Sequence, residues 1–235
     1  MTGKAYREKK GYDVRTKKTK VEKRLTNQEA DRLLESITPD THKGYWKRNK
    51  AVIQFLLNTG LRIGEMHGLL ISDLIGINGK LKDVLYVRPE IAKRKKARNI
   101  PLNRKAQESV KFLIEDRPEV LITDSLVVQP NGKPLGKKAL QDIVKLSALK
   151  AGIDRLVGPH NLRHTCLSQL YEKTKNVKVV QTIAGHARSQ LTIDLYTHAT
   201  MDGLTEAMKT LDDEETNGDD KQKGASGEGE KSRPK

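Results

Sequence analysis

Apolar residues recur at helical spacing through most of the chain, from about residue 25 to residue 211. Thr26 and Glu29 have the spacing of a capping box, and the apolar face that follows them predicts a helix. A second helix is expected from Trp46 to Asn58 and to end at Gly60, because helices often terminate at a left-handed residue. Further helices are predicted at Ile63–Leu70, from Asn103 to the residues before Pro118, around Leu140, Ile143 and Val144 up to Gly152, and at 160–173, 176–184, 190–198 and 201–211.

Two short extended segments interrupt the helical pattern. Val84–Val87 is a β-branched and aromatic run, Asn99–Leu102 is a second extended piece, and the lysine-rich segment Lys93–Lys96 lies between them. This arrangement predicts a β-hairpin with a basic tip. We see no internal repeat in the sequence. The expected fold is therefore mainly α with a small antiparallel β-sheet, of the α+β class.

The two ends of the chain differ in composition from the segment between them. Residues 1–24 are rich in lysine and arginine and have almost no apolar periodicity, so we expect a flexible basic arm, with a solubilising tail as the alternative. Residues 212–235 carry no large apolar side chain, which predicts a disordered acidic and polar tail. Between these two ends we expect one folded domain, over residues 25–211.

The net charge of the chain indicates which class of molecule it binds. The chain of 235 residues has 45 Lys and Arg against 30 Asp and Glu, a formal charge of +15, which points to a polyanion and first of all to nucleic acid. No apolar run is long enough for a signal peptide or a spanning helix, so we expect a cytoplasmic protein with no membrane partner. The only cysteine, Cys166, cannot form an intrachain disulfide or a thiolate zinc cluster and is expected in the core.

Four short motifs carry candidate chemistry. His160 and Arg163 are three residues apart at a helix start, where they should share a face and where free backbone N–H groups favour a phosphate. Arg62 lies at a helix-to-helix turn in TGLRIGE, His186 follows a helix end in AGH, and Tyr196 stands in LYTH. Each motif alone is weak, because a His-x-x-Arg pair is usually an ordinary polar face and a lone tyrosine is usually a core residue.

In this order, TGLRIGE, HNLRHT, AGH and LYTH resemble the catalytic domain of the tyrosine recombinases, the phage integrase family, over about residues 24–211. The resemblance implies that Tyr196 is the nucleophile and that Glu65 supports the site without touching the substrate. Phosphate-binding and proton-transfer roles are implied for Arg62, His160, Arg163 and His186.

The family's catalytic lysine lies on a β-hairpin, several residues before an Ile-Pro or Val-Pro strand end. In KRKKARNIP that position falls on Lys93, although Lys95 and Lys96 are too close to exclude. We expect Lys95, Lys96 and Arg98 to contact DNA, and a solvated hairpin tip that meets phosphate nonspecifically is the alternative for this lysine run.

The resemblance also implies a mechanism. Fixed arginines stabilise the charge that develops on a phosphodiester during attack, which suits Arg62 and Arg163. A phenol needs an acceptor for its proton, for which we favour His160, and the departing 5′ oxygen needs a donor, for which we favour Lys93. His186 would bond the phosphate and pack beside the tyrosine. Because the cations are side chains, we expect no metal and no cofactor.

The expected function is site-specific DNA recombination of the integrase or invertase type, through a 3′-phosphotyrosyl intermediate. The alternatives are relaxation of DNA like a type IB topoisomerase, and a DNA-binding accessory protein with a relic active site. Residues before Thr26 are too few for the separate DNA-binding domain of most family members, so the layout is similar to the short recombinases with a catalytic domain alone. AGH also replaces the more usual Leu-Gly-His.

Double-stranded DNA is the expected partner, with self-association into a dimer or tetramer on it. Leu204, Met208 and Leu211 give residues 201–211 an apolar stripe. This stripe could dock on a neighbouring copy or pack on its own domain.

Overall fold

The computed structural model describes residues 24–42, 44–115, 117, 121–185 and 201–211. Our predictions for the basic arm, for the helix at 190–198 and for the polar tail concern residues outside these ranges, apart from residue 24. The described helices and strands are α2 (Asn27–Glu35), α3 (Pro39–His42), α4 (Trp46–Thr59), α5 (Ile63–His67), α6 (Ile71–Leu74), β1 (Val84–Val87), the 3-10 helix η1 (Lys93–Lys95), β2 (Arg98–Pro101), α7 (Arg104–Ile114), α8 (Lys137–Lys150), α9 (Pro159–Thr174), α10 (Val177–Ala184) and α12 (Met201–Lys209).

Helix boundaries follow the capping signals in the sequence. Thr26 Oγ1 accepts from the backbone N–H of Glu29 at 3.2 Å, and the Glu29 carboxylate accepts from the backbone N–H of Thr26 at 2.9 Å, so the capping box at α2 is confirmed. Gly60 ends α4 with a left-handed φ of 61°. The Asn103 side chain accepts from the N–H of Ala106 at 2.9 Å and caps α7. The helices α3 and α6 were not predicted, because four residues are too few to show a helical period.

The predicted hairpin is present. β1 and β2 are antiparallel, with Leu85 opposite Ile100 and Val87 opposite Arg98. Leu85, Val87 and Ile100 are fully buried, whereas Tyr86 is half exposed, so one face of the hairpin packs on the helices. The turn between the strands contains η1, which places the lysine run at the exposed tip.

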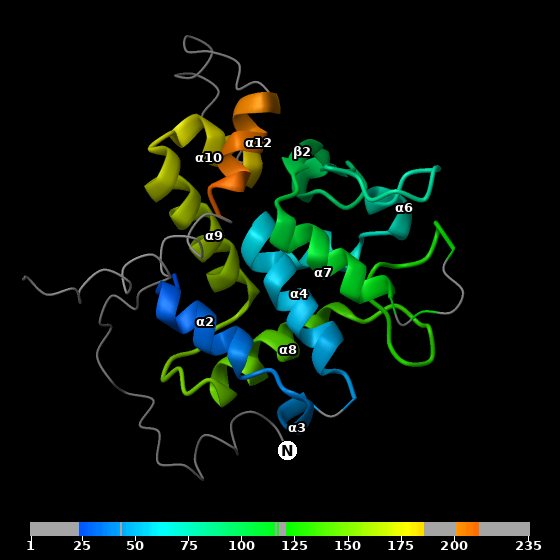
Figure 1. Ribbon diagram of the computed structural model, residues 1–235, viewed down its shortest axis with the longest axis vertical. Helices are drawn as coiled ribbons and strands as arrows, with labels where there is room; N and C mark the ends of the chain where they lie inside the picture. Colours follow the sequence, from blue (N-terminus) through cyan, green and yellow to red (C-terminus); the bar gives the residue numbers. More distant parts are fainter. Residues whose placement is uncertain (1–23, 43, 116, 118–120, 186–200, 212–235) are drawn as a thin grey trace, which may run out of the picture.

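Helix α4 lies at the centre of the fold. It packs against α7 and α9 and also contacts α2, α3 and α8 (Figure 1). Phe55 and Leu56 of α4, Val110 of α7 and Leu162 of α9 are fully buried, so these helices share one hydrophobic core. The hairpin and α6 lie to one side of α4, and α9, α10 and α12 lie to the other (Figure 1). The ends of α4, α9 and α10 and the hairpin can therefore meet in space.

Helix α12 packs on its own domain. It contacts β2, α9 and α10, and Met208 and the following Leu211 are 1% and 9% exposed. Of the two roles left open for the apolar stripe, the structure shows this intramolecular packing.

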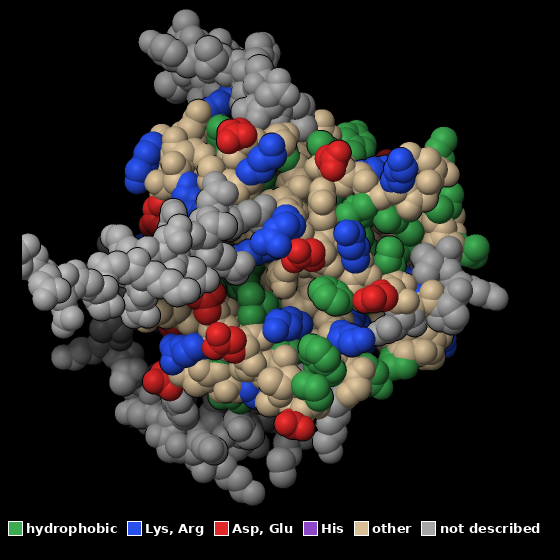
Figure 2. Space-filling model, in the orientation of Figure 1, with side chains coloured by type: hydrophobic (Ala, Val, Ile, Leu, Met, Phe, Trp, Pro, Cys, Tyr) green, Lys and Arg blue, Asp and Glu red, His purple; other side chains and the backbone are tan. Residues whose placement is uncertain are grey.

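Basic side chains are dispersed over the face of the molecule in Figure 2. Lysine and arginine residues alternate there with acidic ones and form no single patch. No helix within the described part of the chain is both long and apolar enough to cross a bilayer.

Candidate functional site: an arginine cluster beside a lysine hairpin

The turn between α4 and α5 presents Arg62 and holds it with Glu65. Glu65 Oε2 accepts from the backbone N–H of Arg62 at 2.8 Å, and Oε1 accepts from Arg62 Nη1 at 3.0 Å. The Glu65 side chain is 1% exposed and that of Arg62 is 23% exposed. Glu65 thus fixes both the backbone and the guanidinium of Arg62, while Arg62 still reaches the surface.

Arg98 approaches the same carboxylate from the hairpin. Its Nη1 and Nη2 donate to Glu65 Oε1 and Oε2 at 2.9 and 2.7 Å, in the two-pronged geometry that arginine and carboxylate favour. Its Nε donates to the carbonyl of Ile183, near the end of α10, at 2.8 Å. The side chain is 5% exposed and directed inward, which disfavours the predicted contact of Arg98 with DNA.

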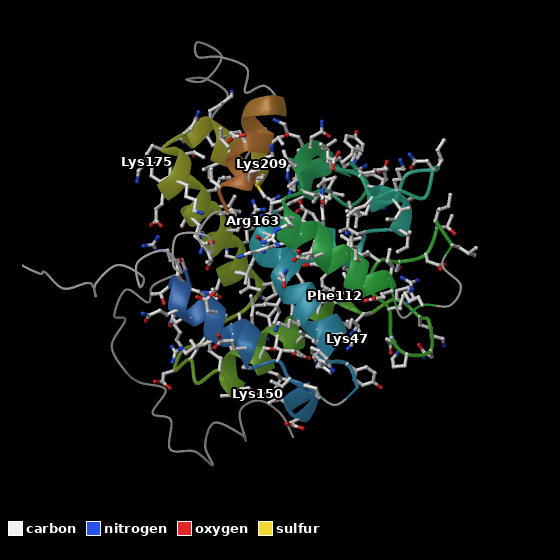
Figure 3. All side chains as sticks on the ribbon, viewed as in Figure 1. Lys47, Phe112, Lys150, Arg163, Lys175 and Lys209 are labelled. Atoms are coloured by element: carbon white, nitrogen blue, oxygen red, sulfur yellow. The ribbon has the colours of Figure 1, made fainter. Side chains whose placement is uncertain are left out.

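Arg163 joins the ends of two helices. From α9, its Nη1 donates to the carbonyl of Gly60 at the end of α4, and its Nη2 donates to the carbonyl of Ala184 at the end of α10 at 2.6 Å. The last carbonyls of a helix lack partners within the helix and carry partial negative charge, so they suit a buried guanidinium. Figure 3 shows Arg163 near the middle of the view, beside α4, whereas Lys175 lies at the periphery.

Charge within this arginine cluster, made of Arg62, Glu65, Arg98 and Arg163, shifts two pKa values. Burial opposes ionisation of Glu65 most strongly, but hydrogen bonds and charge from Arg98, with hydrogen bonds from Arg62, outweigh it and lower the carboxyl pKa to about 2. Burial, then the charges of Arg62 and Arg98, lowers the pKa of Arg163 to about 10. At neutral pH three guanidinium groups surround one carboxylate, so the cluster favours an anion such as a phosphate.

The hairpin brings a second set of cations. Lys93, Lys95 and Lys96 are all exposed at the tip, in or next to η1. Lys95 has a left-handed φ of 52°, a backbone conformation that residues other than glycine seldom adopt. All three lysines are free to meet a ligand at the surface, and the choice among them as proton donor stays open.

His160 lies in the first turn of α9 and is exposed. Its ring meets that of His164 edge-on, with 4.6 Å between the centroids. The two residues predicted to share a face therefore differ in burial, because Arg163 turns inward to the helix-end carbonyls and His160 remains at the surface.

The segment that follows α10 carries the other two predicted residues. Gly185 ends α10 with a left-handed φ of 62°, and a Cβ added there would lie 2.9 Å from Arg98 Cδ. His186 and Tyr196 lie outside the described residues. The structure thus places Gly185, the residue just before His186, directly on the arginine cluster.

The inward contacts of Arg98 were not predicted from the sequence, where we expected this side chain to contact DNA. The available signal was the two-residue period of a strand, which puts Arg98 on the same face as the apolar Ile100. A second anchor, at the same turn-side end of the hairpin but on the side of β1, was also not predicted. There Arg88 donates from Nε and Nη2 to the two carboxylate oxygens of Asp73, at 2.6 and 3.0 Å, and from Nη2 to the Gly68 carbonyl at 2.9 Å.

Within the described ranges, no three His, Cys, Asp or Glu side chains are grouped so that they could hold a metal ion. Cys166 is buried in the core as predicted, and burial raises the pKa of its thiol to about 12. It is therefore not a reactive thiolate.

Comparison with known proteins places these residues in context. Residues 23–202 match the phage integrase family. The chain is similar to "Tyrosine recombinase XerD" of Corynebacterium glutamicum, with 33% identity over 69% of this chain and 52% of that protein, so it spans about half the length of this relative. Among solved structures, it is similar to the XerA recombinase, with TM-score 0.58, 27% identity and coverage of 81% of this chain and 65% of that one. A further likeness is the XerH site-specific recombinase bound to difH substrate in a pre-cleavage complex, with TM-score 0.58, 27% identity and coverage of 85% and 57%.

Proposed function

Because this chain belongs to the phage integrase family, we propose that it is a site-specific DNA recombinase that cuts and rejoins strands through a 3′-phosphotyrosyl intermediate. The observation that carries the proposal is the arginine cluster, in which Arg62 of the α4–α5 turn and Arg163 of α9 are far apart in sequence and are held by Glu65 and by the helix ends. Such fixed cations stabilise the charge that builds on a phosphodiester during attack. The recombinase names of the relatives favour strand exchange over DNA relaxation or a purely accessory role.

In the proposed reaction, the Tyr196 oxygen attacks phosphorus, and the bond from phosphorus to the 5′ oxygen breaks. Arg62, Arg163 and His186 hold the phosphate, and His160 accepts the phenol proton. A hairpin lysine, Lys93 by sequence register, gives a proton to the departing 5′ oxygen. Attack by the 5′ hydroxyl of a partner strand then restores a phosphodiester, so the covalent link conserves the bond energy and no external energy source is needed.

The proposed partners follow from this reaction. The substrate is double-stranded DNA, in keeping with the XerH complex, and exchange between two duplexes requires several copies of the chain, assembled on DNA as a dimer or tetramer. Lys95 and Lys96 would contact phosphates beside the cleaved bond. We place this activity on nucleoid DNA in the cytoplasm.

Replacing Tyr196 by Phe tests the nucleophile. Tyr196→Phe removes only the attacking oxygen, so it should retain DNA binding and abolish the SDS-resistant covalent adduct with a nicked suicide duplex. The duplex is one that the wild-type chain binds, selected from a randomised pool. Tyr171→Phe, at an exposed tyrosine of α9, is the matched control and should form the adduct like the wild type.

The same assay separates the functions. An adduct followed by joining to a second duplex supports recombination, and an adduct followed only by plasmid relaxation indicates topoisomerase activity. Binding without an adduct in the wild type would show an accessory protein. An adduct that survives in Tyr196→Phe would remove Tyr196 as the nucleophile.

A further inference from the structure

Arg98 is a buried arginine whose guanidinium is held by two other elements of the fold. All three of its side-chain nitrogens have acceptors in other elements, two on the Glu65 carboxylate of α5 and one on the Ile183 carbonyl of α10. Both side chains of the Arg98–Glu65 pair are at most 5% exposed. A buried, two-pronged pair of this kind fixes relative position more strictly than an exposed ion pair, because neither group can turn to solvent.

Arg98 lies on the hairpin next to the turn that carries Lys93, so its contacts bear on the position of that lysine. Arg98 begins β2 opposite Val87 and follows Lys93 by five residues. The contacts of its guanidinium with Glu65 and α10 therefore tie the base of the turn that carries Lys93 to the arginine cluster.

The end of α10 is shaped to receive this side chain. The left-handed Gly185 lies where a Cβ would come within 2.9 Å of Arg98 Cδ and 3.3 Å of its Nε. The absence of a side chain at residue 185 thus admits Arg98 to the Ile183 carbonyl. The neighbouring Ala184 carbonyl is bonded by Arg163, so two arginines hold consecutive carbonyls at the end of one helix.

We propose that Arg98 is a positioning residue that sets the lysine hairpin, Arg62 and the α10 end into one geometry for strand cleavage. It acts on Arg62 through the shared Glu65 carboxylate, on the hairpin through β2, and on the chain entering His186 through the Ile183 carbonyl. This inference rests on the proposed function and adds a residue that does not touch the substrate. Lysine cannot replace it, because a single ammonium nitrogen cannot bond both carboxylate oxygens in a planar fork and reach the Ile183 carbonyl at the same time.

The test is Arg98→Lys, assayed in the full chain on the nicked suicide duplex. We expect single-turnover cleavage to fall about 10- to 100-fold, as small displacements of reacting groups do. DNA affinity and its salt dependence should stay unchanged. A duplex whose bridging 5′ oxygen is replaced by sulfur should recover part of the lost rate, because a thiolate leaves without the proton that the hairpin supplies. Lys93→Ala, Lys95→Ala and Lys96→Ala set the scale for full recovery.

Arg155→Lys is the matched control. Arg155 also forms a fork with a carboxylate, Glu29, and donates to a backbone carbonyl, that of Arg24, but it joins α2 to the segment before α9. This variant should lose comparable thermal stability and keep the wild-type cleavage rate per folded molecule.

Three outcomes would overturn the inference. Arg98→Lys could cleave at the wild-type rate, or Arg98→Gln, which removes the charge, could lower the salt slope by about one, which would make Arg98 a phosphate contact. A loss of cleavage in Arg155→Lys equal to that in Arg98→Lys would reduce both to general stability. If the wild type itself forms no adduct, the proposed function fails, whereas normal cleavage by Arg98→Lys beside an active wild type refutes the inference alone, so the two failures are distinguishable.

Discussion

Glu65 is the residue on which the site depends most directly. One buried carboxylate binds the guanidinium groups of both Arg62 and Arg98 and the backbone of Arg62. Taking such charges out of water costs about as much as their attraction returns, so the net gain in stability is small. Removing one partner is costly, however, because the remaining arginines then lie close together without a counter-charge. The group therefore contributes more to the geometry of the site than to the total free energy of folding.

The low pKa of Glu65 predicts a pH dependence of stability. Its pKa is lowered from 4.5 to about 2 on folding, so the stabilisation is fully present above about pH 4.5 and is lost as pH falls toward 2. Glu65→Gln should lower the free energy of unfolding at pH 7 by on the order of 3 kcal/mol and flatten its dependence between pH 4.5 and 2. Urea unfolding at a series of pH values measures both.

Glu29→Gln is the control for this residue. Hydrogen bonds from Arg155 are the largest cause that lowers the pKa of Glu29, also to about 2, so this variant should show a similar change of slope. Only Glu65→Gln should also lose strand cleavage at neutral pH. Equal cleavage by the two variants would contradict a special role for Glu65 in holding Arg62.

At the scale of elements, the site is assembled from helix ends. α4 and α10 both finish at a left-handed glycine, and the carbonyls near these ends accept from Arg163 and Arg98. The arginines thus donate to carbonyls near helix ends, where partners within the helix run out, and the helices fix the arginines in return.

Gly185 should be more sensitive to substitution than another glycine in the same backbone conformation. Gly152 after α8 has a φ of 67°, and a Cβ added there would meet open space. Gly185 has a φ of 62°, and a Cβ added there would lie 2.9 Å from Arg98 Cδ. Gly152→Ala should cost about 1 to 2 kcal/mol from the left-handed backbone alone. Gly185→Ala should cost about 1 to 3 kcal/mol more and should slow cleavage.

Thermal unfolding and single-turnover cleavage of these two variants provide the measurement. If both alanine variants lose the same stability and both cleave normally, the approach of Arg98 to residue 185 has no energetic consequence.

At the scale of the whole molecule, the excess of positive charge is not gathered on the face in Figure 2, where basic and acidic side chains alternate. Part of the formal charge of +15 lies instead in residues 1–20, which contain eight lysines and arginines and two acidic residues by count along the sequence. DNA affinity should therefore divide into a fixed part from the domain and an electrostatic part from the arm.

Deleting residues 1–20 should weaken binding to all DNA sequences alike. Each lost phosphate contact removes about 0.9 from the slope of log affinity against log salt, so the slope should flatten by a few units. Gel-shift titrations on specific and random duplexes at several salt concentrations measure this. Deletion from Glu214 onward is the control and should change neither slope nor affinity. A loss confined to one DNA sequence would show that the arm reads bases.

The sequence by itself predicted the main helices, the hairpin and the residues of the candidate site. Helical spacing, the Thr26 and Asn103 caps and the Gly60 end predicted the main helices, because these signals act between residues a few positions apart. The motifs likewise predicted that Arg62 and Arg163 would serve one site, and the structure brings both to the end of α4.

Only the tertiary structure decided what each side chain contacts. Arg98 meets Glu65 and Ile183 across 33 and 85 residues of sequence, and Arg163 meets Gly60 across 103. Such hydrogen bonds depend on how helices and hairpin pack, and a lysine- and arginine-rich stretch does not reveal which cation turns inward. For the same reason the apolar stripe of α12 could be recognised along the chain, but its burial against β2, α9 and α10 could not. Side-chain partners are set by the packing of distant elements, whereas periodicity and caps record only local geometry.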